Sequence, residues 1–163
     1  MAVSTIDGTV KEAVLKRSRR GLNQYERVVF ELADGTSKTW ANAVVHESVA
    51  AQLQPGTRGR FYLYTTLDHR GIHGVRTADG ASLYHFTSQY ETFTMLISIL
   101  FLSLILLSFL VGATQQVLSF VLLLLAAPMY FHYRGARLAA NAQFDADGDY
   151  RPAPPAEVVA GTG

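Results

Sequence analysis

Two long apolar runs dominate the hydrophobic pattern of the chain. Residues 93–113 contain no charged side chain and no histidine, and residues 117–133 are uncharged up to His132. A helix that spans a membrane needs about 20 predominantly apolar residues, and both runs are apolar on every face. The pattern therefore predicts an antiparallel two-helix transmembrane hairpin over residues 91–134, with helices at about 93–113 and 117–133.

Before the hairpin, apolar and polar positions alternate in short segments, which is the pattern of half-buried strands. Asp34-Gly35 and Asp79-Gly80 indicate tight turns between strands, because glycine tolerates the positive φ that such turns need. Gly8 is expected to mark a bulge in the first strand. The first predicted strand begins at residue 4. The other predicted strands occupy residues 25–33, 36–41, 58–66, 72–77 and 81–86.

Residues 42–53 change period, since Val45, Val49 and Leu53 recur every four residues. With Asn42 in the N-cap position, this spacing predicts a helix of about three turns. Three strands, a helix and two or three further strands favour a mainly β small barrel of the oligonucleotide/oligosaccharide-binding (OB) type. An SH3-like barrel and an open sheet capped by the helix are the alternatives.

The chain is thus expected to divide into three parts. Residues 1–90 would form a cytoplasmic β-barrel domain, residues 91–134 the membrane hairpin, and residues 135–163 a polar, disordered cytoplasmic tail that is rich in proline and glycine. Residues 1–20 contain no apolar stretch like that of a signal peptide, so the hairpin itself is expected to direct the chain to the membrane.

The formal net charge of +1 argues for neither nucleic acid nor an acidic partner. The chain contains no cysteine, which excludes disulfides, thiolate metal sites and a cysteine nucleophile. His69 and His73 flank a predicted turn, where their spacing does not place them on one face as a helix would. No catalytic or nucleotide-binding motif is found, and we expect a protein without enzymatic activity, metal or cofactor.

The basic run at residues 16–20 is predicted to form an exposed loop beside a strand whose outer face carries further basic and aromatic side chains. Such a surface could pair with phosphates and stack on bases, bind anionic lipid headgroups, or dock an acidic protein patch. The nearly balanced charge of the domain disfavours nucleic acid. The candidate residues for contact with a partner or lipid are Lys16, Arg17, Arg19, Arg20, Arg60, Tyr62 and Tyr64.

Aromatic and basic residues flank the two apolar runs on the side of the predicted barrel. Aromatic side chains favour membrane interfaces, and an excess of arginine favours the cytoplasmic face. Both termini are therefore expected in the cytoplasm, and a bacterial inner membrane fits this organisation. The expected interface anchors are Tyr90, Phe93, Tyr130, Phe131, His132, Tyr133 and Arg134.

These features favour a non-enzymatic integral membrane protein that acts as an accessory, assembly or scaffolding subunit of a larger membrane complex. Its partners would be membrane lipids and another integral membrane protein. A self-assembling module that forms a homo-oligomeric ring or pore is the alternative. A membrane-tethered barrel that binds nucleic acid is the third hypothesis.

Overall fold

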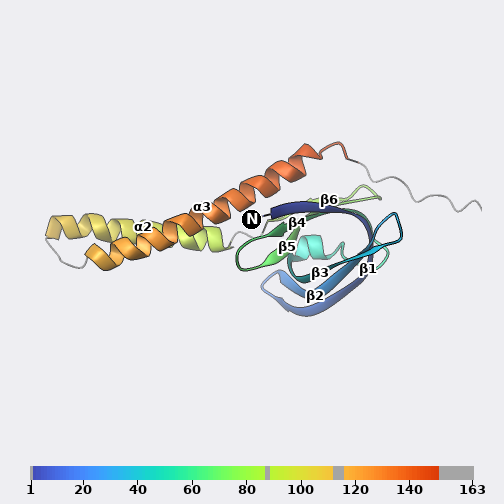
Figure 1. The fold of residues 1–163 in the computed structure, drawn as a ribbon, viewed down its shortest axis with the longest axis horizontal. Coiled ribbons are helices and arrows are strands. Elements are labelled where there is room, and N and C mark those ends of the chain that lie inside the picture. Colours follow the sequence, from blue (N-terminus) through green and yellow to red (C-terminus); the bar gives the residue numbers. More distant parts are fainter. Residues whose placement is uncertain (1, 87–88, 112–115, 151–163) are drawn as a thin grey trace, which may run out of the picture.

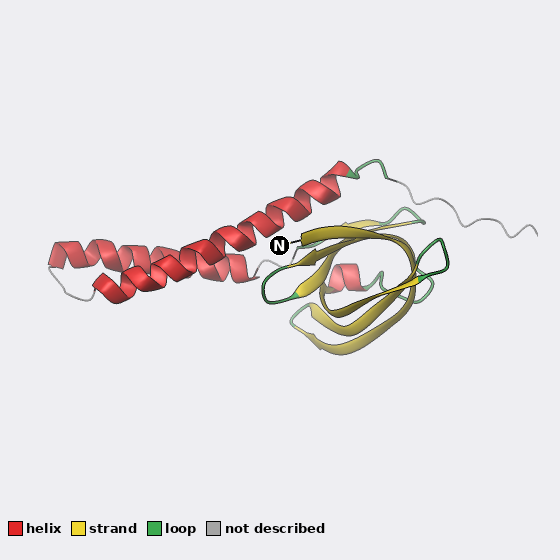
Figure 2. Ribbon diagram, viewed as in Figure 1, coloured by secondary structure: helices red, strands yellow, loops and turns green. Residues whose placement is uncertain are grey.

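The computed structural model describes residues 2–86, 89–111 and 116–150, which form a closed β-barrel and a pair of long helices (Figures 1 and 2). The helices extend away from the barrel, and the second half of the last helix returns across its outer surface. In chain order the elements are β1 (Ala2–Arg19), β2 (Leu22–Glu31), β3 (Ser37–His46), α1 (Glu47–Ala50), β4 (Arg58–Thr65), β5 (Arg70–Thr77), β6 (Ser82–Tyr84), α2 (Gln89–Val111) and α3 (Gln116–Ala146).

Five strands close the barrel in the order β3-β2-β1-β4-β5, and a parallel pairing between β3 and β5 completes the ring. The short β6 pairs with β5. The 18 residues of β1 allow it to pair with β4 through its first half and with β2 through its second half. The register of β1 against β2 shifts between Val10 and Glu12, where the strand bends around the barrel.

The barrel interior is filled by apolar side chains from every strand of the ring. Val28 and Phe30, which the alternation in β2 predicts to share one face, are both fully buried. Phe61 lies against Phe30 with the ring centroids 4.8 Å apart. Trp40 of β3 is only partly buried at the edge of this cluster.

The helix predicted for residues 42–53 is wrong over its first half. β3 continues to His46, and Asn42 lies within it at φ 53° instead of capping a helix. The helix is a single turn, α1, whose N-cap is His46. The four-residue spacing is misleading because Val45 points inward from a strand that pairs with β5, whereas Val49 belongs to the helical turn.

The two long helices lie side by side, and most of their large apolar side chains are exposed. Both are long and apolar enough to cross a membrane, over Tyr90–Phe109 and within Val117–Ala146. Because water-exposed apolar surface on this scale is unfavourable, these helices point to integration into a membrane. The short connection between them, which includes residues 112–115, lies outside the described residues.

The second helix is longer than predicted. It continues for 13 residues past Tyr133 to Ala146, where a disordered tail was expected, and Pro128 lies inside the helix without ending it. The extension is helical because Ala136, Ala140 and Phe144 recur every four residues and are all buried against the barrel. Residues 151–163 of the predicted tail lie outside the described residues.

Replacement of a core aromatic side chain provides a test of the barrel interior. Phe61→Ala should lower the free energy of unfolding of the barrel by about 3–5 kcal/mol, because it removes a large buried side chain and leaves a cavity. The measurement is urea unfolding of the full-length protein in neutral detergent, followed by the fluorescence of Trp40. Leu15→Ala is the control, since Leu15 is 51% exposed and its truncation should cost less than about 0.5 kcal/mol. Equal effects of the two substitutions would contradict the assigned core.

Candidate functional site

The predicted basic loop is instead the end of a strand. Residues 16–19 belong to β1 and pair with β2, and Arg20 and Gly21 form the turn between the two strands. The strand persists because Arg17 and Arg19 lie opposite Gln24 and Leu22 in regular antiparallel register. All four basic side chains of the run remain exposed, as predicted.

The turn holds Arg20 in an uncommon backbone conformation. Arg20 has φ 51° and Gly21 has φ 77°, so both central residues of the two-residue turn have positive φ. Hairpin turns of this kind favour asparagine, aspartate and glycine, and a residue with a long side chain there costs on the order of 1 kcal/mol. An arginine therefore occupies a position for which it is poorly suited by conformation.

The basic strand end lines an open groove of about 560 Å³ beside the start of the first long helix. One wall is formed by Arg17, Arg19 and Arg20, and the lining also includes His69 and Tyr90. Tyr90, predicted as an interface anchor, is half exposed in this groove, with its ring centroid 5.9 Å from that of His69. The structure thus brings three of the predicted contact residues together with one predicted anchor.

Tyr62 and Tyr64 do not belong to this surface. They point away from the barrel interior, as the alternation in β4 predicts, but both are fully buried because other parts of the chain cover that face. Phe144 of α3 packs edge-on against Tyr62 with the centroids 4.9 Å apart, and Tyr64 lies under Phe86 at 4.8 Å. The prediction of an exposed aromatic face on β4 is therefore wrong, and these rings offer no platform for stacking bases.

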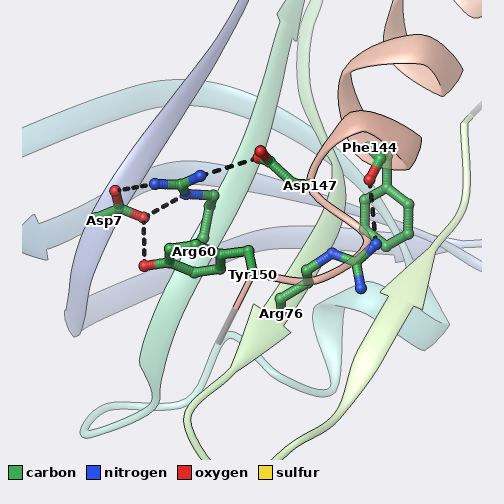
Figure 3. A network of polar contacts seen from close by, with 6 residues as sticks. All are labelled: Asp7, Arg60, Arg76, Phe144, Asp147 and Tyr150. Atoms are coloured by element: carbon green, nitrogen blue, oxygen red, sulfur yellow. Dashed lines mark hydrogen bonds and ion pairs between the residues drawn. The ribbon is translucent and has the colours of Figure 1, made fainter. Parts of the chain in front are cut away.

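Arg60 is also separated from the basic groove and lies in a polar cluster at the end of α3 (Figure 3). Its Nε and Nη2 atoms both donate to Asp7 at 2.7 Å, and its Nη1 atom donates to Asp147 at 3.0 Å. The ring of Tyr150 lies 3.7 Å from the guanidinium carbon, and its hydroxyl donates to Asp7 at 3.0 Å. The hydrogen bonds from Arg60 hold the pKa of Asp7 below its usual value.

Arg76 makes a second fastening at the same end of α3. Its Nη2 atom donates to the backbone carbonyl of Phe144 at 3.1 Å, and its guanidinium lies 4.2 Å from the centre of the Phe144 ring (Figure 3). Arginine near a helix C-terminus satisfies carbonyls that have no partner within the helix and opposes the negative end of the helix dipole. Arg60 and Arg76 together fix the end of α3 on β4 and β5.

His73 lies beneath α3, fully buried among aromatic rings. Tyr62, Tyr64 and Tyr84 surround it at centroid distances of 6.1, 5.8 and 5.7 Å. Within the part of the chain that the structure describes, neither ring nitrogen has a hydrogen-bond partner. Burial lowers the pKa of His73 to about 4. His69, the other histidine that flanks the predicted turn, is half-buried, and its Nε2 atom is hydrogen-bonded to the Tyr64 hydroxyl at 3.1 Å.

The other predicted anchors lie at the same level of the two helices as Tyr90. Phe93 and Phe131 are 60% and 66% exposed, which suits contact with lipid. Tyr133, in contrast, is buried and stacks on Tyr90 with the ring centroids 5.7 Å apart. The remaining predicted anchors are the partly buried Tyr130 and His132 and the exposed Arg134, whose Nη1 atom donates to the Tyr130 hydroxyl at 2.7 Å.

An ion pair between the two helices was not apparent from the sequence. Arg137 donates from Nε and Nη2 to the carboxylate of Glu91 at 2.7 and 3.0 Å. The residues are 46 positions apart, so no local spacing reveals the contact. Asp147 and Tyr150 were likewise missed. The four-residue spacing of Ala136, Ala140 and Phe144 was the available signal that α3 continues and approaches the barrel.

In the described ranges, no group of three or more histidine and carboxylate side chains is placed to hold a metal ion. Comparisons with protein families, with curated proteins and with solved structures find no match to this chain. The function of the chain is therefore inferred from the arrangement of its own residues.

The ion pair between Arg60 and Asp147 predicts the local stability of the end of α3. Asp147→Asn should remove about 1 kcal/mol from this partly buried contact, which corresponds to about fivefold faster amide exchange in residues 137–146. Hydrogen exchange of the full-length protein in detergent measures the effect. Asp149→Asn is the control because Asp149 is exposed, and it should leave these rates unchanged. Unchanged rates in Asp147→Asn would show that the ion pair does not fasten the helix.

Burial of His73 predicts a pH-dependent stability. Its pKa is about 4 in the folded chain and near 6.5 in the unfolded chain, so between these values the unfolded chain binds more protons. Stability should therefore fall by about 2 kcal/mol from about pH 7 to about pH 5. Urea unfolding followed by Trp40 fluorescence gives the slope. His73→Phe should remove most of it, whereas replacement of the exposed His85 by glutamine should retain most of it. An equal slope in His73→Phe would contradict the assignment.

Proposed function

We propose that the chain is a non-enzymatic membrane protein that presents its barrel at the membrane surface as an accessory or scaffolding subunit of a larger membrane complex. The observation that carries this proposal is the continuity of α3. One uninterrupted helix provides an apolar exposed segment and then a segment packed on the barrel. The barrel therefore has a fixed position relative to the apolar pair of helices.

A fixed barrel suits docking better than flexible tethering does. In a docking subunit, the helices pack against the helices of a partner while the barrel contacts the same partner outside the membrane. Preorganised geometry lowers the entropic cost of such a two-part contact. The exposed apolar side chains of α2 and α3, such as Leu106, Phe109 and Leu125, supply surface for lipid and for partner helices.

The barrel topology and the charged flanks support the remaining parts of the proposal. Parallel pairing of β3 with β5 closes the ring, and α1 lies between β3 and β4 in the chain. This arrangement favours an OB-type barrel over an SH3-like barrel. Arg134 and Arg137 follow the apolar part of α3, which favours cytoplasmic placement of the barrel and both ends of the chain. A bacterial inner membrane is the location that we propose.

Purification of the full-length protein from native membranes in a gentle detergent tests this function. We expect a different integral membrane protein to co-elute in stoichiometric amount, identified by mass spectrometry. A homogeneous homo-oligomer would instead support the ring or pore alternative and contradict the accessory role.

A change in the link between span and barrel tests the importance of the fixed geometry. Insertion of Gly-Ser-Gly between Arg134 and Gly135 should interrupt α3 and reduce the amount of co-eluting partner at least fivefold, because the two contacts then no longer reinforce each other. The control is the same insertion after Gly35, in the exposed turn between β2 and β3. Equal retention of the partner by both variants would contradict a role for the rigid connection.

A further inference from the structure

The groove beside the turn between β1 and β2 has a strongly positive wall. Arg17 and Arg19 are two positions apart in a regular part of the strand, so their side chains leave the same face. Arg20 adds a third guanidinium from the adjacent turn, and all three residues line the groove. Three cations are thus held within a few residues of one another on a single surface.

The positive charge of this wall is not neutralised within the described part of the chain. No carboxylate there forms an ion pair with any of the three arginines. Asp68, the acidic residue in the lining, is 3.0 Å from the Nδ1 atom of His69 and accepts a hydrogen bond from Thr66 at 3.0 Å. Glu47 lies beside the turn, with its carboxylate facing the backbone of Gly21.

The backbone of Arg20 is an independent indication that this side chain has a role. Its φ of 51° belongs to a conformation that glycine or asparagine adopts more readily. Arg20 is exposed, and no ion pair within the described ranges explains its presence in the turn. Conformational strain that is not compensated by a contact within the chain is typical of residues that contact a ligand.

The groove also lies at the level where the chain enters the apolar region. Tyr90, which contributes to the lining, is the first residue of the apolar segment Tyr90–Phe109. The groove is therefore at the end of the barrel from which the helices project (Figure 1). Tyrosine at this position marks the interface between hydrocarbon and headgroups, so the arginines face the headgroup layer.

We propose that this groove binds the phosphate of an anionic membrane lipid, with Arg17, Arg19 and Arg20 pairing with the phosphate oxygens and Tyr90 contacting the upper part of the acyl chains. The planar guanidinium group pairs with two phosphate oxygens at once, which makes arginine well suited to this ligand. A groove of about 560 Å³ accommodates one headgroup, whereas a protein partner requires a broader surface. The inference rests on the membrane integration proposed above but not on the accessory role.

Competition between two lipids tests the proposal with the full-length protein in neutral detergent micelles. The micelles contain equal amounts of phosphatidylglycerol and phosphatidylcholine, and native mass spectrometry counts the lipid that stays bound. We expect one phosphatidylglycerol to be retained in preference to phosphatidylcholine. R17Q/R19Q/R20Q should reduce this preference at least tenfold. The control K11Q/R27Q/K38Q removes three positive charges from positions of the β1–β2–β3 sheet away from the β1–β2 turn and should retain it.

A second variant separates binding from folding. Arg20→Asn places a residue that favours positive φ in the turn, so it should unfold at an equal or higher urea concentration than the wild type. It should nevertheless retain phosphatidylglycerol several-fold less well. Retention equal to that of the wild type in both groove variants, or equal loss in the groove and control variants, would overturn the proposal.

Soluble glycerol phosphate distinguishes the source of the phosphate group. We expect millimolar glycerol phosphate to leave the bound phosphatidylglycerol in place, because the lipid also has its acyl chains beside Tyr90. Displacement by glycerol phosphate would overturn the lipid assignment in favour of a soluble phosphate ester. Loss of lipid binding in the groove variants with retention of a co-eluting protein would leave the accessory role intact, so the two proposals fail separately.

Discussion

The packing of α3 against the outer face of β4 and β5 is the contact on which the rest of the structure depends. It is possible because Ala136 and Ala140, both fully buried, allow the helix backbone to approach the sheet closely. Gly74 makes room for Phe144, since a Cβ atom at this position would lie 2.8 Å from the phenylalanine ring. Small residues on both sides thus convert a strand surface that would otherwise be exposed into a second apolar core.

This contact also determines the electrostatics of the region. Beneath α3, His73 and Tyr84 are removed from water, which lowers the pKa of the first and raises that of the second to about 12. Around the edge, Arg60 and Arg76 have partners from α3 or the residues just after it. Neutral groups therefore occupy the centre of the contact and charged pairs its periphery, as in many protein interfaces.

The sequence predicts the barrel and the apolar helices well because those signals are local. Alternation in β2, the glycines of the two tight turns and the uncharged stretch from Phe93 to Val111 all act over a few residues. The error at Asn42 arose because a strand followed by one helical turn can reproduce the spacing of a helix. The strand period alone could not determine that the outer face of β4 is buried, since α3, which covers part of it, is more than 70 residues away in the chain.

The candidate groove could be predicted only in part, because only some of its features have a local signal in the sequence. The exposed basic run is evident in the sequence, whereas its proximity to Tyr90 depends on closure of the barrel and on the position of α2. The φ of Arg20 could not be inferred from composition, because Arg20-Gly21 is not one of the residue pairs that identify such a turn. Pairs such as Glu91 with Arg137 arise from the tertiary arrangement and have no sequence period.

The uninterrupted α3 also has a mechanical consequence. Its 31 residues form a continuous helix about 46 Å long, with one end in the apolar region and the other packed on the barrel. When a bilayer becomes thinner, a transmembrane helix of fixed length tilts, and a continuous helix transmits that tilt to the domain packed on its other end. The barrel would then move in response to the thickness of the surrounding membrane.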